Sequence, residues 1–289
     1  MDAITVAAER GGTVESRHRV HAVAVHHGEV VEAYGDPDLV TFMRSAAKPL
    51  QALPLALAAP DLPEEELAIA CASHEARPEQ LRAAGSLLAR AGRVEEDLEC
   101  GPEKGSRLRH NCSGKHAGML LLCRLRGWPH EGYRLADHPL QQGMLTLVAE
   151  ASGHEADRTP IAVDGCGVVT FALPLRAMAT TFSRLATGQL DGAGRVVEAM
   201  LRHPELVGGP EASDTRVMRE RAGAIAKRGA EGVLCVGLQD GTGIALKVED
   251  GSNRAVLPAA GLFLGISAEA ERPITNSRGE VVGSLKGHA

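Results

Sequence analysis

Segments with β-strand character lie near both ends of this 289-residue chain, whereas segments with helical periodicity fill its middle. Runs rich in β-branched residues occupy the first 43 residues, where Gly11-Gly12 and His27-Gly28 act as turn signals. Two further apolar runs flank Asp240-Gly241 and predict paired strands late in the chain. The simplest packing brings both sets of strands into one mainly antiparallel sheet with flanking helices. The predicted fold class is therefore mixed α/β, of the α+β kind.

The region after the first strands is predicted to be helical from Lys48 onward, because apolar residues recur there at spacings of three and four. A short strand and a Gly-rich turn interrupt the helices at 159–167. Later helices are expected over 173–186, 193–204, 214–229 and 255–267. The stretch 208–214 is the most loop-like, and the last twenty residues show no clear pattern. We expect a single unit over 1–289 with a helix-rich middle at about 48–155.

Composition and charge argue against several classes of partner. Aromatic residues make up 2% of the chain and the formal net charge is −6, so neither stacking platforms nor a basic stripe for nucleic acid or an anionic membrane is present. No apolar run approaches the ~18 residues of a transmembrane helix, and the N-terminus does not resemble a secretory signal. We therefore expect a cytoplasmic protein whose six cysteines are free thiols or metal ligands.

Ser45 and Lys48 stand three residues apart where a β-like run changes to a helical one. On a helix two such residues share a face, so a neutral lysine there is able to take the serine proton, as in Ser-Lys hydrolases. Burial or a nearby cation, such as Arg44, would make the lysine neutral. In the structural alternative, Ser45 caps the helix and Lys48 is a solvated residue of its first turn. The spacing alone does not decide between the two.

Cysteines at two separate places are candidate metal ligands. Cys112, Lys115 and His116 crowd the start of a predicted helix, and Cys166 lies in a Gly-rich turn. Two thiolates and a third ligand would make a zinc site with an open fourth position. From residue types alone, His116 is the expected third ligand, because lysine rarely binds metal. Two buried structural cysteines are the alternative.

Three other side chains are candidates for chemistry. Ser73 and His74 follow an apolar run, and they offer a hydroxyl and a base, although a histidine in this position is more often a turn or core residue. Lys247 lies among apolar neighbours in a predicted strand, where burial would lower its pKa, unless it occupies the polar face of an edge strand. No phosphate-binding glycine motif is present, so a nucleotide enzyme is not supported.

Taken together, five motifs resemble the class 3 L-asparaginase family, which is typified by the inducible rhizobial enzyme. In chain order they are RSAAKPLQ, CASHEARPE, HNCSGKHAGML, VDGCGV and GIALKVEDG. The resemblance covers essentially the whole chain, and the ordered set is far more specific than any one motif. It implies an amidohydrolase that converts L-asparagine and water to L-aspartate and ammonia. It also implies a fold similar to serine β-lactamases and glutaminases, and a homodimer.

The resemblance implies two serine–lysine pairs. Ser45 and Lys48 correspond to the family's S-x-x-K pair, and Ser73 and Lys247 to a second catalytic serine with its lysine. In the implied acyl-transfer mechanism Ser45 attacks the side-chain amide, while Lys48 acts first as base and then as proton donor to ammonia. Ser73 and Lys247 would relay protons and activate the deacylating water. Which serine attacks stays open at this point.

Zinc, one ion per chain, is the implied cofactor. Its implied ligands, with water completing the shell, are Cys112, Lys115 and Cys166. Lys115 thus takes the place of His116, which becomes a residue lining the substrate site. Arg44 and Asp164 hold positions associated with substrate binding, where a cation suits the α-carboxylate of asparagine and a carboxylate suits its α-ammonium.

Two other functions remain as alternatives. A glutaminase or a β-lactam-recognising relative would use the same serine–lysine chemistry on another substrate. A zinc-stabilised binding protein would carry the same motifs with an inert Ser-Lys pair.

Overall fold

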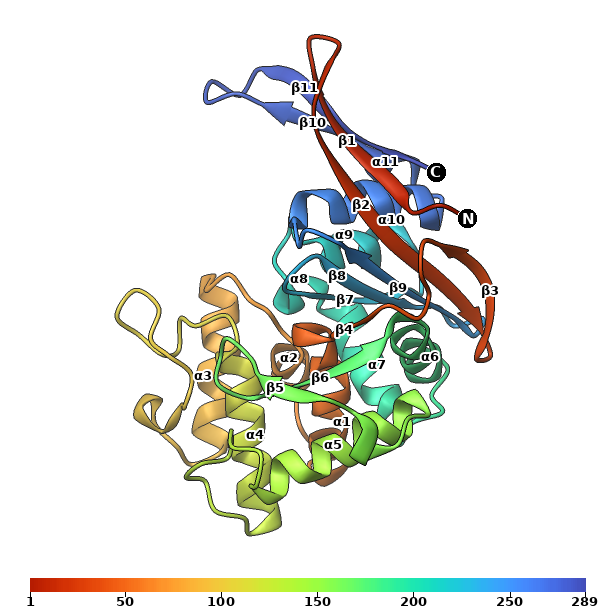
Figure 1. Cartoon of the computed structure of the whole chain (residues 1–289). Helices are drawn as coiled ribbons and strands as arrows, with labels where there is room; N and C mark the ends of the chain where they lie inside the picture. The colour runs from red at the N-terminus through yellow and green to blue at the C-terminus, as the bar shows by residue number, and fades with distance from the viewer.

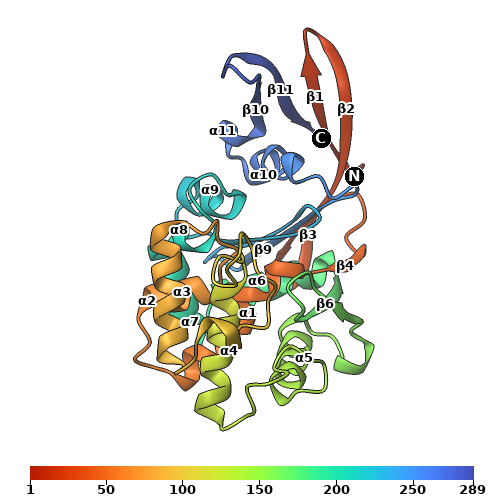
Figure 2. The same cartoon turned by 90° about the vertical axis from the view of Figure 1, so that its left-hand side faces the viewer.

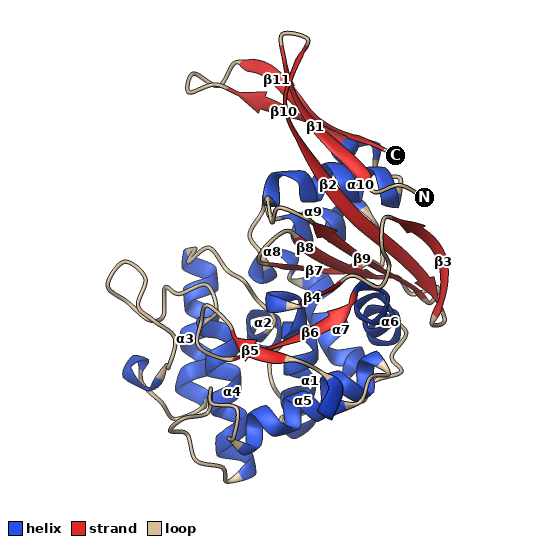
Figure 3. Cartoon of the chain, viewed as in Figure 1, coloured by secondary structure: helices blue, strands red, loops and turns tan.

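The computed structural model describes residues 1–289 and shows a large sheet at one end of the molecule and a helical region at the other (Figures 1 and 3). The sheet runs in the order β10-β11-β1-β2-β9-β8-β7, with β3 paired to β2 as an eighth strand. The strands are β1 (Ile4–Arg10), β2 (Thr13–His26), β3 (Glu29–Tyr34), β7 (Ile225–Gly229), β8 (Val233–Gly237), β9 (Thr242–Val248), β10 (Glu271–Thr275) and β11 (Val281–His288). All neighbours are antiparallel. The predicted mixed fold, with N- and C-terminal strands in one antiparallel sheet, is confirmed.

Strand β2 joins the two halves of this sheet through its 14 residues. Its first half pairs with β1, and its second half pairs with β9 along one edge and with β3 along the other. Exposed and less exposed residues alternate in the first half, whereas Val20–Val25 are all buried. Alternation is typical of a sheet with one wet face, and continuous burial of a sheet covered on both faces. The first half accordingly lies in the arm of β1, β2, β10 and β11 that extends from the body (Figure 2).

The helical region also contains a second, three-stranded sheet of β4 (Val40–Phe42), β6 (Val169–Pro174) and β5 (Ile161–Val163). The helices are α1 (Lys48–Ala58), α2 (Glu64–Ala70), α3 (Pro78–Arg90), α4 (Ser113–Arg126), α5 (Pro139–Ser152), α6 (Leu175–Ala186), α7 (Ala193–Arg202), α8 (Pro204–Val207), α9 (Ser213–Glu220), α10 (Val256–Leu264) and α11 (Ser267–Ala270), with the 3₁₀ turns η1 (Arg44–Ala47), η2 (Glu95–Asp97), η3 (Ala156–Arg158) and η4 (Asn253–Ala255). One hydrophobic cluster of 83 buried residues extends from the large sheet into these helices. None of the helices is both long enough and apolar enough for a membrane crossing.

The segment 214–229, which the sequence pattern predicts as one helix, is the main difference in secondary structure. Helix α9 ends at Glu220, Gly223 has a φ of +75°, and the chain then enters β7. The helix ends because its C-cap residue, Arg221, is already extended (φ −120°, ψ 102°), and the hydrogen bonds of β7 with β8 then replace the helical ones. The patternless C-terminus likewise becomes β10 and β11 through pairing with β1. The strands around Asp240-Gly241 and the closing helix, which is α10, are confirmed.

Gly243 of β9 allows helix α6 to pack directly on the sheet, because a Cβ there would overlap the carbonyl oxygen of Ala179. We expect Gly243→Ala to lower the free energy of unfolding by about 1–3 kcal/mol, the usual cost of overpacking. Gly194→Ala in α7 is the matched control, since no atom lies within 4 Å of its Cβ position. That change should add up to ~1 kcal/mol through helix propensity. Urea denaturation checks both values, and equal stability of the two variants would contradict the packing argument.

Candidate active site

The edge strand β7 meets the 3₁₀ turn η1 at the junction between the large sheet and the helices. A Cβ at Gly229 would lie 2.6 Å from the carbonyl oxygen of Met43, so a glycine is needed for this approach. Ala46 and Ala47 of η1 are buried in the same contact region. The chain then enters α1 at Lys48, whose side chain is only 1% exposed. The start of α1 is thereby placed beside the buried end of β7.

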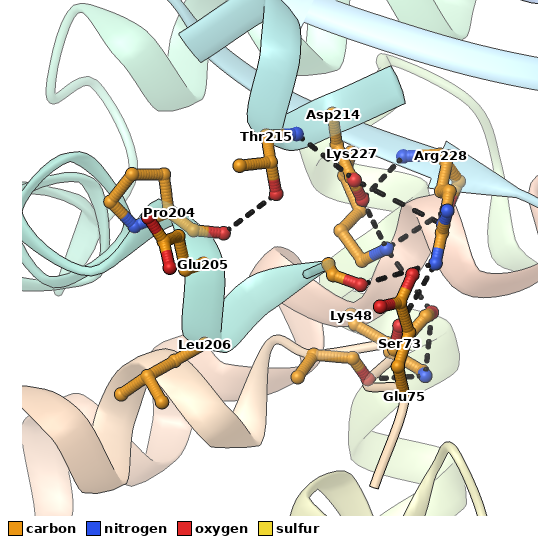
Figure 4. A network of polar contacts seen from close by, with 12 residues as sticks. Lys48, Ser73, Glu75, Pro204, Glu205, Leu206, Asp214, Thr215, Lys227 and Arg228 are labelled. Carbon is orange, nitrogen blue, oxygen red and sulfur yellow. Dashed lines mark hydrogen bonds and ion pairs between the residues drawn. The ribbon is translucent and has the colours of Figure 1, made fainter. Parts of the chain in front are cut away.

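The hydroxyl of Ser73 lies between two buried lysines at this junction (Figure 4). Lys48 Nζ donates to Ser73 Oγ at 3.0 Å and to the carbonyl oxygen of Ala72 at 2.5 Å. Lys227 Nζ lies 3.1 Å from the same Ser73 Oγ. A hydroxyl in contact with two amino groups has a proton acceptor within reach as soon as either lysine is neutral.

The segment after α2 holds Ser73 rigidly in this position. The Ser73 amide donates to Val207 O at 2.8 Å, and the next residue, His74, contacts Ser113 Oγ through Nε2 at 2.8 Å. The Ala76 amide donates to His74 Nδ1, so the ring hydrogen is on Nε2 and is donated to Ser113. Burial lowers the pKa of His74 to about 3. His74 is therefore a neutral, fully paired turn residue rather than a base.

Lys227 makes two further contacts besides the one with Ser73. Its Nζ donates to Asp214 Oδ2 at 2.9 Å and to the carbonyl oxygen of Arg228 at 3.0 Å. Burial lowers the pKa of Lys227 to about 8, although the Asp214 carboxylate opposes that change. A lysine with such a pKa is partly neutral near pH 8, as a general base must be.

The prediction that Lys247 lies beside Ser73 is wrong, and Lys227 occupies that position. Lys247 Nζ donates to the carbonyl oxygens of Glu231 at 2.7 Å and Val248 at 2.5 Å, at the far end of β9. Lys227 was missed because its segment reads as a continuation of a helix. Gly223, which interrupts the segment predicted as a helix, is a local signal against one continuous helix.

The predicted partnership of Ser45 with Lys48 is also wrong in its geometry. Both hydrogen bonds of the Lys48 amino group go to the segment at Ala72 and Ser73 instead. Ser45 is not the helix cap either, since the N-cap positions of η1 and α1 belong to Met43 and Ala47. Ser45 does line a cavity of about 520 Å³ together with Ser73. The two serines thus share one cavity, and only the Ser73 hydroxyl contacts lysine amino groups.

The three predicted zinc ligands, Cys112, Lys115 and Cys166, converge in the interior. Lys115 Nζ lies 3.0 Å from Cys166 Sγ. A hydrogen bond from Cys166 lowers the pKa of Cys112 well below its usual range, against the effect of burial. Burial also acts to lower the pKa of Lys115, but the two neighbouring sulfurs outweigh it and raise that pKa. The cluster therefore favours thiolate and ammonium forms.

No group of three or more His, Cys, Asp or Glu side chains is arranged to hold a metal ion. A zinc ion at this cluster would therefore need the Lys115 amine as its third protein ligand. Two thiolates and one amine are donors that suit zinc in type and number. Since the sulfurs of Cys166 and Cys112 raise the pKa of Lys115 and keep its amine protonated, zinc would have to displace that proton on binding.

His116 is oriented by a chain of hydrogen bonds. The Glu99 amide donates to Tyr133 Oη at 2.9 Å, so the phenol gives its own hydrogen to His116 Nδ1, at 2.6 Å. Burial lowers the pKa of His116 to about 4, which leaves the ring neutral with its hydrogen on Nε2. This Nε2 is buried and has no hydrogen-bond partner. An interaction with the side chain of Cys166 acts to raise the pKa of His116, against the effect of burial. A nitrogen that carries a hydrogen does not bind a metal ion.

Arg44 and Asp164, the predicted substrate-binding residues, form an ion pair with 2.7 Å between Nε and Oδ1. Both are partly exposed, and Arg44 precedes Ser45 in the left-handed conformation, with a φ of +51°. Strained backbone of this kind persists only where the surrounding structure determines it. The pair places a cation and a carboxylate side by side, in the arrangement that a zwitterionic amino acid requires.

The L-asparaginase II family model matches residues 6–286. The chain belongs to the L-asparaginase II family. Membership supports an amidohydrolase activity and identifies the family that the five motifs resemble. No curated protein matches the chain significantly.

Several solved structures are similar to this L-asparaginase II family member at low identity. Mglu in its native form at 4.3 M NaCl is 17% identical, with 86% of this chain and 61% of that chain covered and a TM-score of 0.41. EstCE1, a hydrolase with promiscuous acyltransferase activity, is 12% identical over 79% of this chain and 88% of its own, at 0.42. A probable glutaminase from Bacillus subtilis is 11% identical over 79% and 76%, at 0.34. The chain thus spans less than two thirds of Mglu, and such scores support no conclusion about activity.

Proposed function

We propose that this protein hydrolyses L-asparagine to L-aspartate and ammonia, with Ser73 as the nucleophile. The observation that carries the proposal is the Ser73 hydroxyl held between Lys48 and Lys227, in a chain that belongs to the L-asparaginase II family. This assignment differs from the mechanism inferred from the motifs, in which Ser45 attacks. Ser45 shares the cavity but lacks the lysine contact that would activate it.

In the proposed reaction neutral Lys227 takes the Ser73 proton while Oγ attacks the side-chain amide carbon. The protonated Lys227 then gives this proton to the departing nitrogen, so ammonia leaves and a β-aspartyl ester remains on Ser73. Water attacks the ester, its proton passes to Lys227, and the Ser73 oxygen leaves and takes the proton back. Lys48, which also contacts Ser73 Oγ, stabilises the negative charge that develops on this oxygen.

The substrate would be held by its α-amino acid end. Arg44 binds the α-carboxylate, and Asp164 binds the α-ammonium. On substrate binding, their ion pair with each other is thus replaced by one ion pair between each side chain and the substrate. Because a ligand that lacks either charge does not compensate for breaking this ion pair, simple amides should be poor substrates.

The direct test is ammonia release by the purified chain from asparagine and glutamine, with a chromogenic β-lactam measured beside them. We expect the highest kcat/KM with asparagine. A preference for glutamine or the β-lactam would support the corresponding alternative, and asparagine binding without any turnover would support a binding protein. We also propose that the protein is a homodimer, which analytical sedimentation would test. We propose a cytoplasmic location, which cell fractionation would test.

Ser73→Ala should reduce kcat on the order of 10³- to 10⁴-fold, because the nucleophile is lost while the substrate contacts remain. Ser45→Ala should change kcat much less and act mainly on KM. Steady-state kinetics of both variants, with circular dichroism to confirm folding, separate the two serines. The reverse order of effects would restore Ser45 as the nucleophile.

The pH profile should reflect Lys227. Burial lowers its pKa to about 8, so its proton-accepting neutral form increases as pH rises, and kcat/KM should increase through pH 8. Lys227→Met should lose most of the activity. Lys247→Met is the matched control, because Lys247 contacts only backbone carbonyls away from Ser73. Its profile should equal that of the wild type, and a loss comparable to that of Lys227→Met would contradict the assignment.

We propose that one zinc ion per chain binds at Cys112, Lys115 and Cys166, supported by their convergence and by the donor types. When bound, zinc would supply a fixed positive charge close to the substrate site. Metal analysis after dialysis should find about one zinc per chain in the wild type and none in Cys112→Ser. Cys123→Ala, at another buried cysteine of α4, should keep its zinc. A metal-free wild type that remains metal-free after zinc addition would contradict the proposal.

A further inference from the structure

Asp214 is a completely buried carboxylate behind Lys227, and neither the sequence motifs nor the reaction described above assigns it a role. It lies at the start of α9, with its side chain 0% exposed, and its Oδ2 accepts from Lys227 Nζ at 2.9 Å. A buried charge without a function is costly, and apolar residues of similar size often replace such pairs without loss of stability. A positioning role for Asp214 would explain why this carboxylate is present.

We propose that Asp214 is a positioning residue that aims the lone pair of Lys227 at Ser73, so that Ser73, Lys227 and Asp214 form a relay. The inference rests on the proposed role of Ser73 as nucleophile. Asp214 contacts neither the substrate nor Ser73 in this arrangement and acts through Lys227 alone.

The argument follows from the hydrogen-bonding capacity of a neutral amine, which has two N–H groups and one lone pair. Lys227 Nζ has three polar neighbours, of which the Asp214 carboxylate and the Arg228 carbonyl are only able to accept. These two acceptors take both N–H groups. The lone pair is left pointing at the third neighbour, Ser73 Oγ, at 3.1 Å. Without Asp214 the amine would be free to rotate and donate to Ser73 instead.

Asp214 is itself held by contacts on both of its oxygens (Figure 4). The Arg228 amide donates to Oδ2 at 3.3 Å, the Thr215 amide donates to Oδ1 at 3.1 Å, and the Arg228 Nε lies 3.9 Å from Oδ1. Room for Oδ1 exists because residue 208 is a glycine, and a Cβ at this position would overlap Oδ1. Burial raises the pKa of Asp214, but the charges of Lys227 and Arg228 outweigh it and lower that pKa, so the carboxylate stays ionised.

The charges around Lys227 make the role testable. Lys48 of α1 and Arg228 of β7 are cations that lower its pKa, whereas Asp214 of α9 raises it. The two thiols that face Lys227 are Cys71, after α2, and Cys235, on β8; burial raises the pKa of each to about 12, so both are neutral. Asp214 is therefore the only anion in this group. Removing its charge must lower the proton affinity of Lys227.

The experiment combines a direct titration of Lys227 with kinetics. The chain has only six lysines, so lysine labelled with ¹³C at Cε gives a simple NMR spectrum, and the Lys227 signal is the one absent in Lys227→Met. In the wild type this signal should titrate near pH 8. In Asp214→Asn, which keeps the side-chain shape, it should titrate at lower pH, and the rise of kcat/KM with pH should move in the same direction.

Kinetic parameters distinguish positioning from a structural role. Asp214→Ala should lower kcat on the order of 10²- to 10⁴-fold with little change in KM for asparagine. Asp61→Asn, at an exposed aspartate in the loop after α1, is the matched control and should keep the wild-type Lys227 titration and activity. Loss of thermal stability in Asp214→Asn with an unchanged Lys227 titration would overturn the proposal. A wild-type Lys227 that titrates above pH 10 would also overturn the proposal. This measurement needs only the wild-type titration, so it remains decisive if the Asp214 variants fail to fold.

The titration is read without substrate, so it does not depend on the proposed reaction. A wild-type chain that releases no ammonia from asparagine contradicts the asparaginase proposal, whatever the NMR result. A chain that does release ammonia, and whose Lys227 titration is insensitive to Asp214→Asn, contradicts only the role of Asp214.

Discussion

The contact of one hydroxyl with two buried lysine amines is the interaction on which the rest of the structure depends. Ser73 follows α2, Lys48 begins α1 and Lys227 lies on β7, so the early helices and the late edge strand must meet at one point. Moving two amino groups out of water is costly unless their hydrogens are accepted. Here the acceptors are backbone carbonyls, the serine and one carboxylate. The fold provides these partners and the glycine that allows the approach.

Two buried lysines in this protein have pKa values that shift in opposite directions. Lys115 and Lys227 are both buried, and burial alone would favour the neutral form of each. The sulfurs of Cys112 and Cys166 reverse this effect at Lys115, whereas the cations Lys48 and Arg228 reinforce it at Lys227. Neighbouring charge, rather than depth, therefore decides which lysine is suited to accept a proton. For the same reason, Lys115 would bind a metal ion only after losing its proton.

The secondary structure follows from local patterns only where tertiary contacts agree with them. The hairpin at Asp240-Gly241 and the helix α10 have strong local signals and are present as expected. The segment after α9 has residues that suit a helix, yet it becomes β7, because an edge strand beside β8 satisfies its backbone and buries its apolar face. Pairing with neighbouring strands likewise makes β10 and β11 out of the last twenty residues, which have no clear local pattern.

Local sequence patterns specify the mixed fold class, most of the strands and helices apart from β7, β10 and β11, and the motifs that resemble one enzyme family, because these depend on residues close together in the chain. They also identify Ser73 and the cluster of Cys112, Lys115 and Cys166 as candidates. Which lysine meets Ser73 depends instead on contacts between segments far apart in the chain. Lys227 is 154 residues from Ser73 in sequence, and their contact depends on sheet order, strand register and side-chain direction. A one-residue change of register would turn Lys227 to the other face of β7, and no local pattern specifies that choice.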